Sequence, residues 1–441
     1  MADQRYAKGL IYLYLTYLVV EGALRKWLIP DLATELYLLK DLLLFLGIVP
    51  LLLMAGGERF RWQGSRMLFF IWGGWTFLIT GLLVVSGFSM ESLAGFRYYV
   101  AYLPLLILVP KAFTNISDLN SFGRVYVYLA GFVCLLGIVQ YYSPTDSLIN
   151  SYAWRTLSPD IATFGEVELD SDIARSRITG TFSYISPYAV YLQFVFLVVL
   201  ALLVQVSSQR KATFLLALAA LVFINLAMTG SRGPLLVCSI VGAPLLVLAL
   251  RLRTIGPLPL AVLALAIAAA VLIGVFELLY ARHESAGDAG DRIAGALLGP
   301  FYTFRAIDIL GAGIGTTFAG LGEYLGTGSI GTGFDEVFLD RVGIELGYFP
   351  YAFVLAAKIS IMIATLSIFI RLRDPGAKAW ALVSLGYQAS SVWQIPFYNS
   401  TAGAFYFFSV ALFPLLCTKA AAESRSPRTV AAQTIGTPST G

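Results

Sequence analysis

The sequence predicts an all-α, polytopic membrane protein with about twelve transmembrane helices and one large outer loop. Of its 441 residues, 58% are hydrophobic and 13% are charged, and the mean hydropathy is +0.78. A soluble domain carries about twice that charged fraction. Apolar runs of membrane-spanning length recur from end to end, and every connection on one side of the predicted membrane is basic.

Each spanning helix is predicted from an apolar run that approaches the roughly 20 residues needed to cross a bilayer. The runs lie near residues 9–24, 36–55, 67–87, 97–112, 122–142, 183–206, 212–229, 234–250, 256–280, 347–370, 377–395 and 401–418. They divide the chain into four parts. These are 1–280, with nine helices and an outer loop at 143–182; 281–346, the large outer loop; 347–418, with three helices; and the tail 419–441. The tail lacks apolar periodicity, so we expect it to be disordered.

Lysines and arginines in the connections predict the orientation, because cytoplasmic loops are enriched in them. With a cytoplasmic N-terminus, every inside connection is basic, and the tail is cytoplasmic as well. The inside set comprises Arg5, Lys8, Arg59, Arg61, Arg66, Lys111, Arg124, Arg210, Lys211, Arg251, Arg253, Arg371, Arg373, Lys378, Lys419, Arg425 and Arg428. An error of one helix before residue 250 would destroy this alternation.

A turn between two apolar runs places Arg232 on the outer face, where basic residues are less frequent. It reads NLAMTGSRGPLLVCS (225–239). Gly230 and Gly233 allow the chain to reverse, and Pro234 suits the first position of the next helix. That helix N-terminus has unpaired N–H groups and a partial positive charge, which with the guanidinium predict a site for phosphate or carboxylate. The alternative is an interfacial arginine that extends to water.

Further arginines are expected on the outer side, close to the ends of apolar runs. Gathered there, guanidinium groups could bind the diphosphate of a lipid carrier through paired hydrogen bonds. Alternatively they pair with outer carboxylates, and Glu21 with Arg25, four positions apart, is the clearest example. We expect both roles among this set: Arg97, Arg155, Arg175, Arg177, Arg282, Arg292, Arg305 and Arg341, with Arg25 and Lys26 at the end of the first helix.

Carboxylates precede the helix expected from about residue 347. Glu336 is the leading candidate for a general base on a sugar hydroxyl, and Asp335, Asp340 and Glu345 lie near it in the sequence. The alternative is that such a carboxylate pairs with Arg341 or another arginine.

Two further ionisable residues stand out. His283 lies in a polar stretch and is a candidate substrate-binding residue, and as the single histidine it excludes a multi-histidine metal centre. Lys358 falls inside an apolar run, where it serves either a polar cavity or a neighbouring carbonyl. The three cysteines all lie in apolar runs and indicate neither a disulfide framework nor a metal site.

The pattern resembles the O-antigen ligase and O-antigen polymerase superfamily of bacterial envelope glycosyltransferases. RSRITGTFSYISPYAVYLQ (175–193) looks like that family's entry into a helix after an outer loop, and TGSRGPLLV (229–237) is similar to its Ser-Arg-Gly turn. The long outer loop, with Arg292, a Gly-Xaa-Gly run at 311–315 and DEVFLDRVGIELGYFPY (335–351), resembles its periplasmic loop. EGALRKW (21–27) looks like a feature of one branch.

The resemblance implies a helical fold related to the GT-C class, placed in the bacterial inner membrane. It implies a metal-independent, inverting transfer of a glycan from undecaprenyl diphosphate to a glycan or lipid-linked acceptor, without a cofactor. By position, Arg232 and Arg292 would hold the diphosphate and Arg177 would assist. Membrane lipids surround such a protein, and a flippase and a chain-length regulator are its expected partners, whereas nucleic acid is not.

One departure from the family bears on the reaction. Ligases typically place a histidine near the exit of the loop, whereas this segment reads FDEVFLDRVG, which leaves Glu336 as the nearest base. This favours a polymerase or an exopolysaccharide-type relative over a ligase. The competing interpretations are a secondary transporter or polysaccharide exporter component, and a non-catalytic assembly partner. Against a transporter, the sequence has neither an internal repeat nor midplane binding residues on broken helices.

Overall fold

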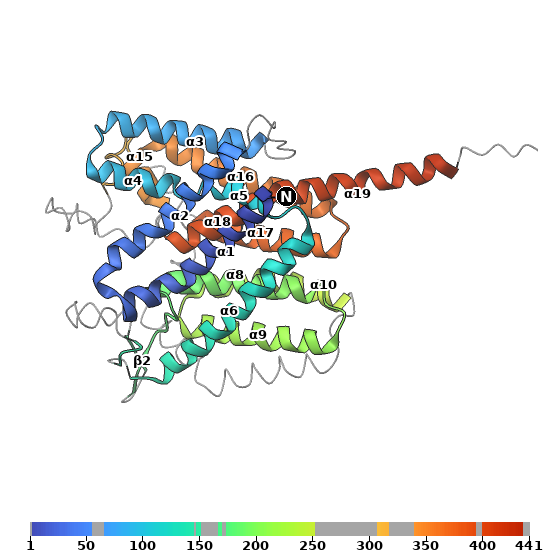
Figure 1. The fold of residues 1–441 in the computed structure, drawn as a ribbon, viewed down its shortest axis with the longest axis horizontal. Helices are drawn as coiled ribbons and strands as arrows, with labels where there is room; N and C mark the ends of the chain where they lie inside the picture. Colours follow the sequence, from blue (N-terminus) through green and yellow to red (C-terminus); the bar gives the residue numbers. More distant parts are fainter. Residues whose placement is uncertain are drawn as a thin grey trace, which may run out of the picture.

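The computed structural model is a bundle of long helices, with α19 projecting from one end (Figure 1). It describes residues 2–54, 66–144, 147–150, 166–169, 173–251, 307–316, 339–393 and 399–434. Within these residues, nine helical segments are long and apolar enough to cross a bilayer. The chain is therefore a multi-pass membrane protein built mainly from α-helices.

The described part of the first third of the chain contributes six helices and two short helical turns. The elements are α1 (Ala2–Ala23), the π-helical turn η1 (Leu24–Leu28), the 3-10 turn η2 (Pro30–Leu32), α2 (Ala33–Met54), α3 (Arg66–Val85), α4 (Met90–Val100), α5 (Leu105–Ala112) and α6 (Ile116–Tyr142). The helices α4 and α5 together form one span, Met90–Ala112. It begins earlier than the apolar run predicts, because the side chain of Ser89 caps α4 by accepting from the backbone N–H of Ser92.

The remaining elements include a small hairpin. They are β1 (Glu166–Leu169), β2 (Ile173–Ser176), α8 (Ile185–Leu203), α9 (Gln209–Met228), α10 (Arg232–Arg251), α15 (Leu339–Leu346), α16 (Tyr348–Arg371), α17 (Pro375–Trp393), α18 (Ser400–Ala411) and α19 (Phe413–Thr434). The strands β1 and β2 pair antiparallel, so part of the predicted outer loop 143–182 is ordered. The apolar run 256–280 lies outside the described residues.

Helix α8 lies at the centre of the bundle and packs on α6, α9, α10, α17 and α18. Sixteen of its residues are buried, as expected for a helix that is apolar on all sides. Its Phe194 stacks on Phe405 of α18, with ring centroids 4.3 Å apart. Helix α3, at the edge, instead exposes Phe70 and Phe77, which suits contact with lipid.

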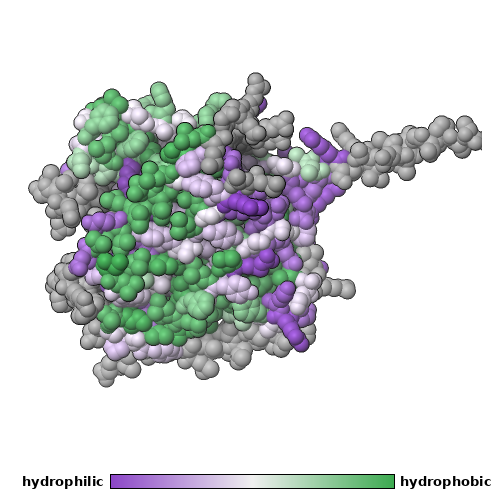
Figure 2. Space-filling model, viewed as in Figure 1, coloured by the Kyte–Doolittle hydropathy of each residue, from purple (hydrophilic) through white to green (hydrophobic). Residues whose placement is uncertain are grey.

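Consecutive helices joined by short turns run in opposite directions, which creates two distinct ends. We call the end with Ala2 and the emerging α19 the N-terminal end, and the end with η1, the hairpin and α15 the cluster end (Figure 1). Figure 2 shows a hydrophobic band across this face of the bundle, with hydrophilic residues gathered toward the N-terminal end. This distribution matches a protein that crosses a bilayer with its basic connections on one side.

The tail corrects one prediction. We expected disorder from about residue 420, but α19 continues as a helix to Thr434. The segment AAAESRSPRTVAAQT is rich in alanine, which has the highest intrinsic helix propensity, and it extends a helix already started by apolar packing.

Candidate functional site

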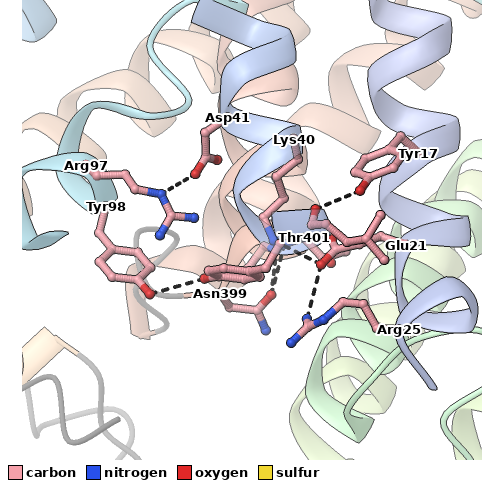
Figure 3. A network of polar contacts seen from close by, with 12 residues as sticks. Tyr17, Glu21, Arg25, Lys40, Asp41, Arg97, Tyr98, Asn399 and Thr401 are labelled. Carbon is pink, nitrogen blue, oxygen red and sulfur yellow. Dashed lines mark hydrogen bonds and ion pairs between the residues drawn. The ribbon is translucent and has the colours of Figure 1, made fainter. Parts of the chain in front are cut away.

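The end of the first helix brings charged side chains to the cluster end. Helix α1 ends at Ala23 and continues as the π-helical turn η1, a rare geometry that is frequent at functional sites. Glu21 and Arg25 form the predicted pair, with Arg25 Nη1 3.1 Å from Glu21 Oε1. Glu21 also accepts from Lys40 of α2, whose Nζ lies 3.2 Å from Oε2. One buried carboxylate therefore joins two cations from neighbouring helices (Figure 3).

The aromatic ring of one tyrosine lies close to both of these cations and to a third cation. The centroid of Tyr37 lies 3.3 Å from Lys40 Nζ, 5.3 Å from Arg25 Cζ and 4.7 Å from Arg97 Cζ. Attraction between a cation and an aromatic face strengthens when water is removed. The three cations thus share one aromatic surface between α1, α2 and α4.

The second carboxylate of this group belongs to α2. Asp41 accepts from Arg97 Nε, across 56 positions of sequence. The hydroxyls of Tyr37 and Tyr98 lie 3.2 Å apart and close the group. We define the Tyr37 cluster as Glu21, Arg25, Tyr37, Lys40, Asp41, Arg97 and Tyr98. Figure 3 shows that its labelled members face one another beside Asn399, the N-cap of α18.

Lys26 extends the polar contacts to the loop after the hairpin. Its side chain is buried and donates to Thr179 Oγ1 at 3.0 Å and to the carbonyl of Gly180 at 2.9 Å. Gln140 of α6 binds the same peptide: its Oε1 accepts from the N–H of Thr179 and of Gly180, and its Nε2 donates to the carbonyl of Gly180. The loop is held from two helices.

Arg177 connects this loop to the turn that carries Arg232. Its Nε donates to the carbonyl of Thr229 at 2.8 Å. Thr229 ends α9, Gly230 has φ +66°, and α10 begins at Arg232. The predicted reversal is therefore present, although Pro234 stands third in α10 rather than first. The guanidinium of Arg177 is thus bonded to the residue three positions before Arg232, at the cluster end.

We call six cations at the cluster end the cationic band: Arg25, Lys26, Lys40, Arg97, Arg177 and Arg232. Arg25, Lys40 and Arg97 pair with the two carboxylates of the Tyr37 cluster, whereas Lys26 and Arg177 donate to backbone carbonyls of the neighbouring loop and turn. Cations at the boundary of a low-dielectric bundle favour an anion as counter-charge. Guanidinium groups suit phosphate oxygens in particular, because their N–H groups match them in pairs.

The predicted site residues divide into three groups. Arg97, Arg177 and Arg232 lie in the band. Arg341 lies on α15, and the backbone of Arg175 pairs with Val167 in the hairpin. The others lie outside the described residues: Glu336, Arg292, Arg305 and His283.

Glu345, considered above among the carboxylates near Glu336, has structural partners. It accepts from the hydroxyl of Tyr99 at 2.8 Å and from the N–H of Gly315 at 3.1 Å. Gly315 has φ +85°, and a Cβ there would collide with the carbonyl of Glu91. The Gly-Xaa-Gly run is therefore packed closely against α4.

For several residues of the site, the sequence did not predict which side chains they would contact. Lys40 and Asp41 stand inside an apolar run, and that unusual position was the signal available. Gln140 offered no such signal, because a polar residue near a helix end is common. Of the two roles considered for Lys358, a polar cavity or a neighbouring carbonyl, the structure shows the second: its Nζ donates to the carbonyl of Ser391 at 2.6 Å.

Within the described part of the chain, no group of three or more His, Cys, Asp or Glu side chains is arranged to hold a metal ion. What the band offers chemically is a set of cationic hydrogen-bond donors, suited to a multiply charged phosphate ester. Comparison of the sequence with protein-family models and with curated proteins returns no match in either case.

Proposed function

We propose that this protein is a glycosyltransferase that transfers or polymerises an oligosaccharide carried on undecaprenyl diphosphate. It works at the periplasmic face of the bacterial inner membrane, through about twelve helices and a large periplasmic loop. A polymerase is favoured over a ligase because FDEVFLDRVG contains no histidine. Both termini are cytoplasmic in this proposal.

The cationic band is the observation that carries the proposal. A lipid carrier would present its diphosphate at the level of the bilayer surface, where the band lies at the end of the bundle. Arg177 and the Arg232 turn are joined by a hydrogen bond. Lys26, which follows Arg25 of the Tyr37 cluster in the sequence, donates to Thr179 and Gly180 in the loop that carries Arg177. A transporter would instead be expected to hold its substrate near the middle of the membrane.

The orientation is supported by the turns of the opposite end. The first turn of α9 contains Arg210 and Lys211, and the connection after α16 contains Arg373. Basic residues mark cytoplasmic connections, so the cluster end faces outward.

In the proposed reaction, a hydroxyl of the acceptor attacks the anomeric carbon, the bond from that carbon to the diphosphate oxygen breaks, and the configuration inverts. Arg232 and Arg292 neutralise the charge that develops on the departing diphosphate, while Arg177 assists. Glu336 takes the proton of the hydroxyl as general base.

Reconstitution provides the test. The pure protein in nanodiscs is given a lipid-linked repeat unit, and the glycan product is measured by electrophoresis. Arg232→Ala and Arg292→Ala should each reduce the rate about a hundredfold, the size typical of losing one donor to a developing negative charge. Arg373→Ala, at the opposite end, is the matched control and should retain the rate.

Product formed by this protein alone would exclude a non-catalytic assembly role. Product of unchanged length and amount from both Arg232→Ala and Arg292→Ala would contradict the proposal. Coupled uptake of a solute into proteoliposomes would favour a transporter.

A further inference from the structure

The peptide from Thr179 to Gly180 is clamped between two helices. Lys26 reaches it from η1 with two hydrogen bonds, to the hydroxyl of Thr179 and the carbonyl of Gly180. Gln140 reaches it from α6 with three, accepting from both amides at 3.2 and 2.7 Å and donating to the carbonyl at 3.1 Å. Gln140 is fully buried and Lys26 is 3% exposed. Hydrogen bonds in such surroundings fix geometry closely, because water cannot replace them.

Glycines allow this close approach. A Cβ on Gly22 of α1 would collide with the backbone of Thr181 and Ser183, and a Cβ on Gly180 would lie 2.8 Å from the ring of Tyr188. Gly180 also has φ +56°, which other residues adopt rarely. The loop therefore rests directly on α1 and α8, without room to shift.

The clamp lies two residues beyond Arg177. Arg177 in turn donates from Nε to the carbonyl of Thr229, in the turn that starts α10 at Arg232. The path from Lys26 and Gln140 to Arg232 thus contains only hydrogen bonds and short stretches of backbone. A movement of the clamped peptide would displace Arg177 and release its contact with the turn.

We infer that Lys26 and Gln140 are positioning residues, which hold Arg177 and the Arg232 turn at the spacing a diphosphate requires. The inference rests on the proposed function for its ligand. Lys26 differs in role from the arginines of the band, because its ammonium is directed to Thr179, Gly180 and the ring of Trp27, 4.4 Å away. It acts through Arg177 and does not touch the ligand.

Affinity for undecaprenyl diphosphate tests the inference, measured on the full chain in nanodiscs, with inorganic pyrophosphate as the competing probe. Lys26→Met and Gln140→Leu should each weaken binding about tenfold, since a hydrogen bond from or to such buried groups is worth about one decade in an equilibrium. Lys26→Arg, which keeps charge and donors, should recover most of the affinity. If pyrophosphate competes with the lipid, the protein binds the diphosphate headgroup. If it does not compete, the protein binds the lipid chain, and the inference is overturned.

A double-mutant cycle separates positioning from general damage. If Lys26 acts through Arg177, Lys26→Met should cause little further loss of affinity in a protein that already carries Arg177→Ala, because the contact that Lys26 supports is already absent. Hydrogen exchange of the amides of Thr179 and Gly180 should also become faster in Gln140→Leu. Lys358→Met removes another buried lysine bonded to a carbonyl and is the matched control: it should leave affinity and loop exchange unchanged.

The outcomes are distinguishable. Faster loop exchange with weaker, non-additive binding supports the inference. Wild-type affinity in both variants, or full additivity with Arg177→Ala, overturns it and leaves the proposed function intact. Absence of binding by the wild type overturns both. Should Lys26→Met fail to fold, Thr179→Val removes the hydroxyl that accepts from Lys26 and gives the same comparison with little change of volume.

Discussion

The two ends of the bundle use charge in different ways. At the N-terminal end, Lys8 Nζ lies 2.7 Å from Asp118 Oδ1, and their side chains are 30% and 20% exposed. At the cluster end, Lys40 and Glu21 form a pair whose side chains are only 1% and 7% exposed. The first pair keeps much of its hydration, whereas the second has lost nearly all of it.

The other polar contacts between helices also differ between the two ends of the bundle. At the N-terminal end, neutral groups connect the helices: Asn120 exchanges hydrogen bonds with Gln205 and accepts from Trp380. At the cluster end, charged groups make these connections: Glu21 pairs with Lys40 and Arg25, and Asp41 pairs with Arg97. Burying a charge pair stabilises a fold little or not at all compared with apolar packing. Under the proposed function, these buried charges serve binding more than stability.

Removing the shared carboxylate of the cluster end should have a large effect on stability. Glu21→Gln leaves Lys40 and Arg25 buried without their shared carboxylate, so the free energy of unfolding should fall by about 3–5 kcal/mol. The matched change at the N-terminal end, Asp118→Asn, should cost less than about 1 kcal/mol. Thermal unfolding in detergent measures both. Equal losses would remove the distinction between the ends.

Glycine substitutions in α1 give the next effect. Gly22→Ala forces a methyl group against the backbone of the loop at Thr181, and overpacking of this kind costs about 1–3 kcal/mol. Gly9→Ala, on the same helix, meets nothing within 4 Å and should stabilise the helix by about 0.5–1 kcal/mol. Melting temperatures that shift in the same direction would contradict the close approach of α1 and the loop.

A smaller effect is expected at the centre of the Tyr37 cluster. Tyr37→Leu removes the ring that faces Lys40 and Arg97 and should cost about 2 kcal/mol, as for cation–π contacts shielded from water. Tyr37→Phe keeps the ring and loses only the contact with Tyr98, so about 1 kcal/mol is expected. Identical unfolding curves for the two variants would show that the ring has no electrostatic role.

The smallest effect compares one helix cap from each end. Asn115 caps α6, and Asn399 caps α18 while also donating to Ser186 of α8. Replacement by alanine should cost about 1 kcal/mol at Asn115. Asn399→Ala should cost somewhat more, because it also loses a contact between helices. A larger loss at Asn115 would indicate that the N-terminal end is the more constrained one.

Hydropathy predicted most of the described spans, because a helix in lipid must satisfy its backbone internally and cover itself with apolar side chains. The pair of Glu21 with Arg25 was predictable for a similar reason, since residues four apart share one helix face. The start of α4 at Met90 and the helical tail were not predicted, because caps and helix propensity act without an apolar signal.

Hydropathy was enough to predict that the chain crosses a membrane several times, and the outward arginines Arg97, Arg177 and Arg232 were predicted as members of one set. Their partners were visible only in the folded chain: Asp41 for Arg97, and the carbonyl of Thr229 for Arg177. The reason is physical. Hydropathy reports how each residue partitions between water and lipid, whereas contacts across helices depend on which faces meet, and no local property of the chain contains that information.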